Sequence, residues 1–420
     1  MANTITSYSV YYYDASGTGH GMAGRITDTG SSIAAWPNLN TGLNGDPKVE
    51  GLVDNAGGLR IAVTDYVGGS ARPVTIYNAL TAGAVATPSW SSVENLYTLA
   101  KVGSYLYAMD YDNARVVEIN ATTYAQTGVS YTLPASLTPA GYTAHGQALL
   151  EIGGTLYGLF TFVDSGWTNY AASLLVRFTL SGGSSISVAA TDANAGFARN
   201  AFSMAVNGND LYVCAIGGSQ VAGSYNAASR LQKIDRTAAN LSTATVTDVL
   251  SPSATLPYEF RDISFKGGTA YLLVGAFNSS WQMAGKLLST TNFSTFTTIN
   301  DFSTGAAGYF WSAQYTADND RIWFARGNQI LVYTAASPAS PAATLNLTAG
   351  SLISSGQLYD NINDLSYVGA AGSRSTLRGY RSPLQASRGA QAERARALTG
   401  GRPELTEEER LLLQGEAAAK

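Results

Sequence analysis

The chain has 420 residues, more than one hydrophobic core normally supports, so it must contain several domains or one closed repeat. Only 13% of the residues are charged, while glycine (44) and tyrosine (25) are abundant, which favours short strands and tight turns over long helices. The net charge of -4 argues against nucleic acid as a partner, and no apolar run approaches the roughly 18 residues that cross a bilayer, which argues against membrane insertion.

A pair of alternating strands joined by a glycine-containing turn recurs along the chain. The first copy combines residues 49–53 with 59–63. Further copies lie at 96–99 with 105–109, 147–150 with 155–159, 202–206 with 210–214, 262–265 with 270–274, and 312–315 with 321–325. The second strands begin at residues 59, 105, 155, 210, 270 and 321, at intervals of 46 to 60 residues. Such a period, with room for four strands in each unit, predicts the blades of a β-propeller.

The two ends of the repeat region complete one further blade. Residues 9–13 read as a second strand with no first strand before it, and residues 363–368 read as a first strand with no second strand after it. We therefore expect residues 363–368 to pair with residues 9–13, with Leu365 and Tyr367 on one face. This pairing closes the ring, removes the open sheet edges and makes the blades seven. The predicted fold class is an all-β, seven-bladed β-propeller.

The pattern resembles secreted bacterial propellers of the YVTN and NHL-like kind. The resemblance is clearest in residues 110–124, where a turn leads into the strand Val116-Val117-Glu118-Ile119. It covers about 360 residues as architecture and implies no particular activity. Low charge, abundant serine, threonine and asparagine, and a single cysteine suit an extracellular or periplasmic protein whose leader is absent from this chain.

Composition changes abruptly after Gly369. We expect residues 1–369 to be the propeller and residues 370–420 to be a basic, helix-prone or disordered tail, either an engineered appendage or a natural basic arm. The tail contains eight arginines and ends in a segment, residues 416–420, that matches the rigid-linker repeat used in fusion proteins.

Motifs of known chemistry are missing from the sequence. His20 and His145 are the only histidines and lie more than two blades apart, so a metal site made of several imidazoles is excluded. Nucleophile-elbow, zinc-protease and phosphate-loop patterns do not occur, and Cys214 reads as a small buried hydrophobic residue. We expect no cofactor and no metal.

Two groups of residues are candidates for a ligand site. Propeller geometry places the leading ends of the first strands around the mouth of the central channel, where converging polar groups suit either a small ligand or internal salt bridges. The residues at these ends are Glu50, Glu94, His145, Arg199, Asn200, Arg261, Trp311, and Asn363 with Asp364. Turns between second and third strands open on the same side and contribute Trp167, Tyr170, Tyr225 and Trp281, whose rings suit sugar stacking, a protein surface or ordinary blade packing.

Three functions fit these residues. The sequence favours a non-catalytic recognition propeller that binds a glycan, peptide or protein partner on this face. The alternative is a hydrolase or lyase of a carbohydrate or anionic small molecule, with Glu50 or Glu94 as general base and Arg199 or Arg261 holding an anionic group. A structural protein of a cell surface or filament is the third possibility.

Overall fold

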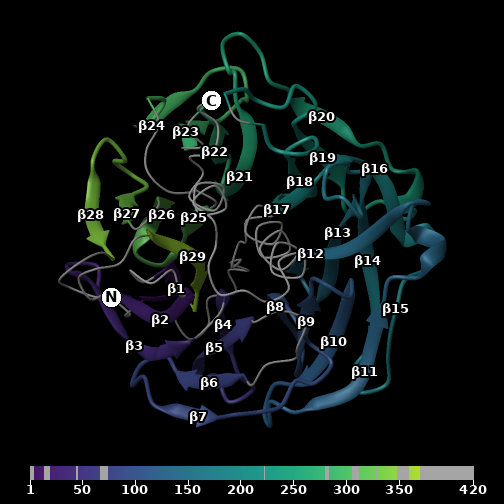
Figure 1. Cartoon of the computed structure of the whole chain (residues 1–420), viewed down its shortest axis with the longest axis vertical. Helices are drawn as coiled ribbons and strands as arrows, with labels where there is room; N and C mark the ends of the chain where they lie inside the picture. Colours follow the sequence, from purple (N-terminus) through teal and green to yellow (C-terminus); the bar gives the residue numbers. More distant parts are fainter. Residues whose placement is uncertain are drawn as a thin grey trace, which may run out of the picture.

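The chain folds into a ring of seven antiparallel sheets (Figure 1). The computed structural model describes residues 4–13, 19–43, 46–66, 74–221, 223–279, 283–304, 312–326, 329–347 and 359–368. The described residues form six four-stranded sheets and one five-stranded sheet, so the prediction of a seven-bladed propeller is confirmed. Within them, no helix has the length and hydrophobicity of a membrane-spanning segment.

The strands of each blade run outward from the channel in order. Blade 1 contains β29 (Tyr359–Tyr367), β1 (Thr4–Tyr13), β2 (Gly19–Asp28) and β3 (Ile33–Leu43). Blade 2 contains β4 (Asp46–Val53), β5 (Leu59–Tyr66), β6 (Thr75–Asn78) and β7 (Ala84–Ala86). Blade 3 contains β8 (Leu96–Val102), β9 (Tyr105–Asp110), β10 (Arg115–Asn120) and β11 (Gln126–Thr132). In blades 2 to 7 the second strands begin within one residue of the predicted position, whereas β1 begins at Thr4, five residues before its predicted start.

The remaining blades repeat this order. Blade 4 has a fourth strand in two parts, both of which pair with its third strand. Its strands are β12 (Tyr142–Ile152), β13 (Thr155–Asp164), β14 (Ala172–Ser181), β15 (Ser185–Ser187) and β16 (Ala193–Arg199). Blade 5 contains β17 (Ala201–Asn207), β18 (Asp210–Ala215), β19 (Arg230–Asp235) and β20 (Thr247–Leu250), and blade 6 contains β21 (Glu259–Lys266), β22 (Thr269–Phe277), β23 (Met283–Thr290) and β24 (Thr297–Asp301). Blade 7 contains β25 (Ala313–Thr316), β26 (Arg321–Arg326), β27 (Gln329–Thr334) and β28 (Pro341–Asn346).

The chain ends close the ring as the sequence predicts, because β29 pairs with β1 along its length. The sequence pattern left the register open, and in the structure Asp364–Tyr367 lie opposite Thr6–Ser9 while Tyr359–Ile362 lie opposite Val10–Tyr13. The strand begins at Tyr359, four residues before its predicted start, and a bulge at Asn363 shifts the register between Ser9 and Val10. Leu365 and Tyr367 are both buried.

A separate apolar core lies at each junction between neighbouring blades. The described residues form seven such clusters, one for each junction of the ring, including the closing junction between blades 7 and 1. That closing cluster packs Tyr8 and Leu365 of blade 1 against Trp323 of blade 7. Side-chain burial of this kind contributes about 1.5–3 kcal/mol for each large apolar residue, so every junction contributes to the stability of the ring.

Small polar side chains of the innermost strands tie neighbouring blades together. The amide of Gly51 donates to Ser366 Oγ (2.8 Å), and the amide of Leu149 donates to Thr98 Oγ1 (3.0 Å). Asp262 performs the same role for blade 7, because its carboxylate accepts the amide of Ala313 (3.0 Å). These bonds satisfy backbone donors that face the next blade rather than a strand of their own sheet.

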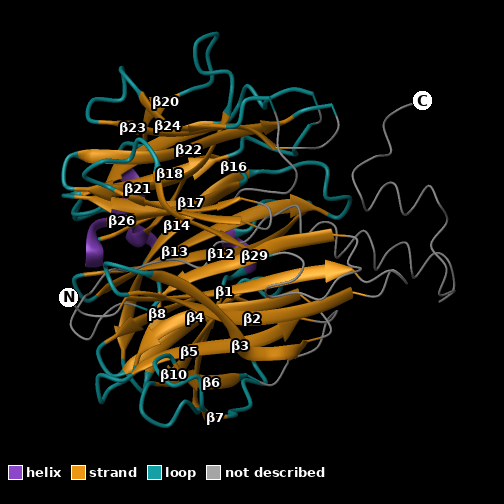
Figure 2. Cartoon of the chain, turned by 90° about the vertical axis from the view of Figure 1, so that its left-hand side faces the viewer, coloured by secondary structure: helices purple, strands orange, loops and turns teal. Residues whose placement is uncertain are grey.

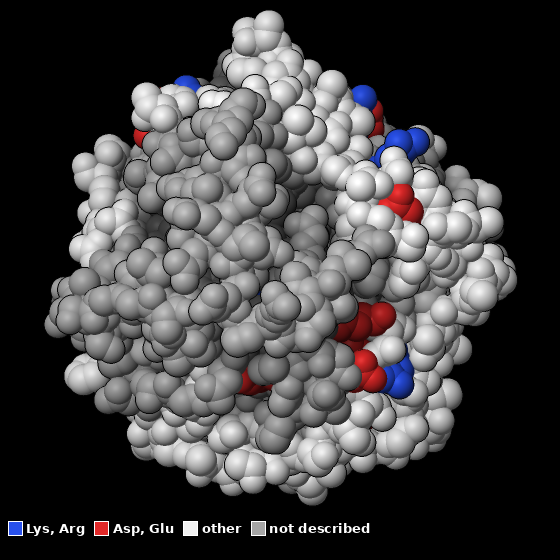
Figure 3. Space-filling view, viewed as in Figure 1, with Lys and Arg blue, Asp and Glu red and all other residues white. Residues whose placement is uncertain are grey.

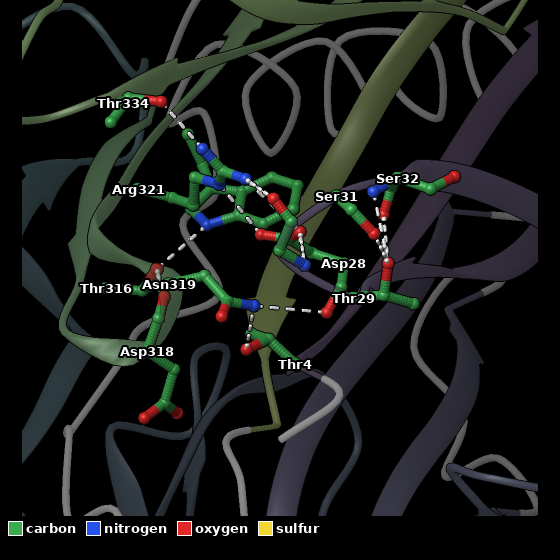
Figure 4. Close-up of polar contacts among 12 residues, drawn as sticks. Thr4, Asp28, Thr29, Ser31, Ser32, Thr316, Asp318, Asn319, Arg321 and Thr334 are labelled. Carbon is green, nitrogen blue, oxygen red and sulfur yellow. Dashed lines mark hydrogen bonds and ion pairs between the residues drawn. The ribbon is translucent and has the colours of Figure 1, made fainter. Parts of the chain in front are cut away.

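Polar contacts fasten the closing junction at the face opposite the channel mouth described below (Figure 4). Arg321 Nε donates to Asp28 Oδ2 (2.9 Å), and its Nη1 donates to Thr334 Oγ1 (2.7 Å). Asn319 Nδ2 donates to Thr4 Oγ1 (3.1 Å). The Asp28 side chain is fully buried, so blades 7 and 1 share a buried ion pair as well as a core.

A β-bulge recurs near the leading end of five innermost strands. In each, one residue has no partner on the second strand, and these residues are Tyr97, Gln147, Phe202, Arg261 and Asn363. Bulges turn a side chain away from the regular alternation and are common beside functional sites. In this propeller they lie around the mouth of the channel.

Candidate functional site

The candidate site lies on the face where the innermost strands begin, which we call the entry face. Figures 1 and 3 view this face, and it lies on the right in Figure 2. The turns between second and third strands lie on it too, so residues from different blades can meet there. On its described part, acidic side chains lie both towards the centre and near the rim, and several of them adjoin basic ones (Figure 3).

Four rings form a stacked column where blades 3 and 4 meet. Tyr97 stacks on Tyr111 (centroids 4.4 Å apart, planes at 27°), and Tyr111 stacks on His145 (4.5 Å, 25°). Trp167 lies on His145 at 4.9 Å with the planes tilted by 40°. Tyr111 begins the turn after β9 and Trp167 lies in the turn after β13, so two turns and two innermost strands build the column.

His145 is buried without a hydrogen-bond partner. It is 5% exposed, and neither ring nitrogen has a hydrogen-bond partner among the described residues. Burial lowers the pKa of His145 to about 4, and the nearby carbonyl of Tyr111 opposes this shift only in part. The imidazole is therefore uncharged at neutral pH, with one nitrogen able to accept a proton and the other able to donate one.

Two neutral side chains next to His145 are also buried without a hydrogen-bond partner among the described residues. Thr161 lies directly opposite His145 in the β12–β13 ladder, so their side chains are on the same face of the sheet. Gln147, the bulge residue of β12, follows two positions later. Each is 1% exposed, and neither the Gln147 amide nor the Thr161 hydroxyl has a hydrogen-bond partner among the described residues. Buried polar groups are almost always hydrogen-bonded, so this group is suited to a ligand that supplies the partners.

Asn200 lies between β16 and β17, where the chain passes from blade 4 to blade 5. It is 1% exposed and has a left-handed backbone (φ 53°), which asparagine adopts more readily than most residues. Its Nδ2 donates to the carbonyl of Gly218 (2.8 Å), whereas its Oδ1 has no hydrogen-bond partner among the described residues. Within the described part of the chain, no group of three or more histidine, cysteine or acidic residues is placed to hold a metal ion.

Arg261 forms a closed pair rather than an open anion site. Its side chain is fully buried, it forms an ion pair with Glu259, and its Nε donates to the carbonyl of Gly275 (3.2 Å). Burial raises the pKa of Glu259, and the Arg261 charge opposes this rise. Since a buried pair of opposite charges is largely self-satisfied, Arg261 is not exposed to bind a ligand from solution.

Other predicted residues at the leading ends occupy different surroundings. Glu50 is 1% exposed and accepts a hydrogen bond from Ser366 Oγ (3.3 Å) at the junction of blades 1 and 2. Glu94 is half-buried just before β8, and Arg199 is exposed at the end of β16. Asp364 lies in β29 opposite Ser9, and Trp311 lies outside the described residues.

The predicted turn aromatics differ in exposure. Trp167 and Tyr225 are half-buried, and Trp281 lies outside the described residues. Tyr170 is only 6% exposed, which agrees with blade packing among the alternatives for these rings. It forms an isolated bridge with Val163 that returns the turn to its own blade, and burial raises its pKa to about 12.

Sequence reasoning identified His145, Asn200 and Trp167 but missed Tyr111, Gln147 and Thr161. Tyr111 was part of a turn whose sequence indicated only a blade connection. Gln147 and Thr161 belong to apolar strands, and a polar residue inside an apolar strand was the available signal. Their meeting with His145 depends on the bulge and on strand register, which the pattern does not reveal.

No protein-family model matches the chain, and no curated protein sequence matches it. Solved structures do. A putative 6-phosphogluconolactonase from Bacteroides uniformis is 11% identical, with 86% of this chain and 100% of that chain covered and a TM-score of 0.54. Another from Bacteroides fragilis is 11% identical (87% and 98% covered, TM-score 0.55), and the periplasmic gluconolactonase of Pseudomonas aeruginosa is 10% identical (88% and 100%, 0.53). At such identities the likeness shows a shared fold.

Proposed function

We propose that this propeller hydrolyses a small carbohydrate-derived ring of the sugar-lactone type outside the cytoplasm. The observation that carries the proposal is the buried, uncharged His145 with unpartnered nitrogens, beside Gln147 and Thr161 and between two aromatic rings. The names of three structures that share the fold, two putative 6-phosphogluconolactonases and a periplasmic gluconolactonase, support this choice over recognition alone.

His145 would act as the general base. One ring nitrogen takes a proton from water as the water oxygen bonds to the lactone carbonyl carbon. The carbonyl oxygen gains negative charge, and the Gln147 amide is a neutral donor suited to stabilise it. When the ring C–O bond breaks, the imidazolium returns the proton to the leaving oxygen, and the product is a hydroxy acid. Because burial disfavours the imidazolium, His145 returns the proton readily within the step.

An uncharged lactone fits this group better than a phosphorylated one. His145, Gln147, Thr161 and Asn200 are all neutral at pH 7, and a buried phosphate without a counter-charge is costly. Acidic side chains near the centre of the described part of the entry face add to this cost (Figure 3).

Hydrolysis of glucono-1,5-lactone, followed against the spontaneous rate in a pH-stat, tests the proposal. We expect acceleration by the wild-type protein and a loss of roughly 10²–10⁴-fold in kcat for His145→Gln, the size of a general-base contribution. His20→Gln, the only other histidine substitution that the chain allows, is the control and should retain activity. Full activity in His145→Gln, or no acceleration of neutral or phosphorylated sugar lactones, would contradict the proposal.

Recognition without turnover is the second candidate, and the half-buried Trp167 favours it. A ring stacked on one side and open on the other can hold a sugar face. Calorimetric binding of a gluconic acid or oligosaccharide panel without any lactone hydrolysis would support this function, and Trp167→Ala should then abolish the binding.

A further inference from the structure

The connection between β18 and β19, residues 216–229, crosses three blades of the entry face, and we call it the strap. Residue 222 within it is outside the described residues. On blade 6, the amide of Gly223 donates to the carbonyl of Phe277 (2.8 Å) and the amide of Asn226 donates to Glu259 Oε1 (2.9 Å). On blade 4, Ser219 Oγ donates to the carbonyl of Thr168. The strap therefore connects the turn that contains Trp167, in blade 4, to blade 6 on the other side of blade 5.

Asn200 forms hydrogen bonds with the first residues of the strap, Ile216 to Gly218, which we call its root. Its carbonyl accepts the amide of Ile216 (3.0 Å), and its side-chain Nδ2 donates to the carbonyl of Gly218 (2.8 Å). Between these bonds, Gly217 has a φ of 93°, and a Cβ there would come within 2.3 Å of the backbone of Ala228. The strap can fold back on itself only with glycine at this point, and the Asn200 side chain fixes its direction from there.

Trp167 has a left-handed backbone, as Tyr124 and Phe293 have in other turns. Its φ of 57° is an outlier for a bulky side chain and costs of order 1–3 kcal/mol. Inside its own turn, the amide of Trp167 donates to the carbonyl of Asp164 (3.0 Å), and the amide of Thr168 donates to Asp164 Oδ1 (2.8 Å). The turn also closes on its own blade, because Asp164 Oδ2 accepts from Thr168 Oγ1 (3.0 Å) and Tyr170 bridges Val163. Ser219 of the strap adds a hydrogen bond from blade 5.

We propose that the strap fixes Trp167 against His145 and that Asn200 is the positioning residue at its root. The chain of contacts runs from Asn200 to Gly218, from Ser219 to Thr168, and from Trp167 to the imidazole. Its effect on turnover rests on the proposed lactone hydrolysis, whereas its effect on the surroundings of His145 does not.

Asn200→Gly tests this role, because glycine keeps the left-handed backbone accessible and removes only the amide. Asn319→Gly is a matched control: Asn319 also has a left-handed backbone (φ 57°), and its Nδ2 also donates to a carbonyl, that of Asp28 (3.2 Å), on the opposite face. We expect both variants to lose similar thermal stability. Only Asn200→Gly should raise the His145 pKa, measured by proton NMR, by roughly half a unit or more, since a displaced Trp167 exposes the imidazole to water.

Two further measurements complete the test. Acrylamide quenching of the Trp167 fluorescence, taken as the difference from Trp167→Phe, should increase in Asn200→Gly. Ser219→Ala, which removes a single hydroxyl and keeps the fold, should reproduce both effects in weaker form. On a lactone substrate we expect KM to rise several-fold and kcat to change less. If Asn200→Gly and Ser219→Ala leave both the His145 titration and the Trp167 quenching unchanged, the proposal is overturned, even if the lactone activity is established.

Discussion

The protonation of His145 should make the stability of the protein depend on pH in a predictable way. The histidine pKa is 6.5 in an ordinary environment and falls to about 4 in the folded protein because of burial. Between these values the unfolded chain binds a proton and the folded chain does not, so stability falls as the pH decreases from 6.5 towards 4. A difference of about 2.5 units corresponds to about 3 kcal/mol in full, of which about 2.5 kcal/mol is lost by pH 4.5.

Urea unfolding of the wild type and of His145→Gln between pH 7.5 and 4.5 isolates this effect. Both proteins carry the same carboxylates, so the pH dependence of their stability difference reports His145 alone. The wild type should lose about 2.5 kcal/mol relative to the variant over this range. Proton NMR gives an independent value, because the only other histidine ring is that of His20.

Parallel stability curves for the two proteins would refute the reasoning. They would mean that the His145 pKa is near 6.5 in the native state and that the imidazole is solvated rather than enclosed by Tyr111 and Trp167. The proposed base would then be partly charged at pH 6, and the argument for a neutral site would fail with it.

Three further predictions concern the ring. Asp28→Ala leaves the Arg321 charge buried without its partner and should lower the free energy of unfolding in urea by about 3–5 kcal/mol. Lys286→Ala, which breaks the partly exposed pair with Asp301, should lower it by less than about 1 kcal/mol. Equal losses in the two variants would contradict the buried-pair account. Deleting residues 361–368 removes most of the innermost strand of blade 1 and should produce aggregation in size-exclusion chromatography, so a monomer as stable as the parent would disprove closure. Deleting residues 370–420 should leave the melting temperature within a few degrees by calorimetry, and loss of folding would show that the tail belongs to the propeller.

The fold could be predicted because local signals repeat. Alternating apolar residues and a glycine turn occur once in each blade, and six approximate copies fixed the strand order, the period and the incomplete blade at the two ends. The pattern did not set the register of that last pairing, and the four residues of β29 from Tyr359 to Ile362 were not included in the predicted strand.

The site could be predicted only in part because it depends on contacts between blades. His145 was visible as one of two histidines near a strand start, but its column with Tyr111 and Trp167 results from how neighbouring turns pack. Arg261 and Tyr170 appeared suitable for a ligand by residue type alone. Their burial follows from the Glu259 ion pair and the bridge to Val163, neither of which has a local sequence signature.

The repeated bulge has a consequence for how such a ring can change. The extra residue in each of the five innermost strands takes no part in the ladder, so substituting its side chain leaves the strand pairing of that blade unaltered. The side chains at these positions are nevertheless buried where they are described: Phe202 lies in an apolar core, Arg261 pairs with Glu259, and Gln147 is 1% exposed. A substitution at a bulge therefore keeps the strand pairing of its blade and acts on the packing between blades.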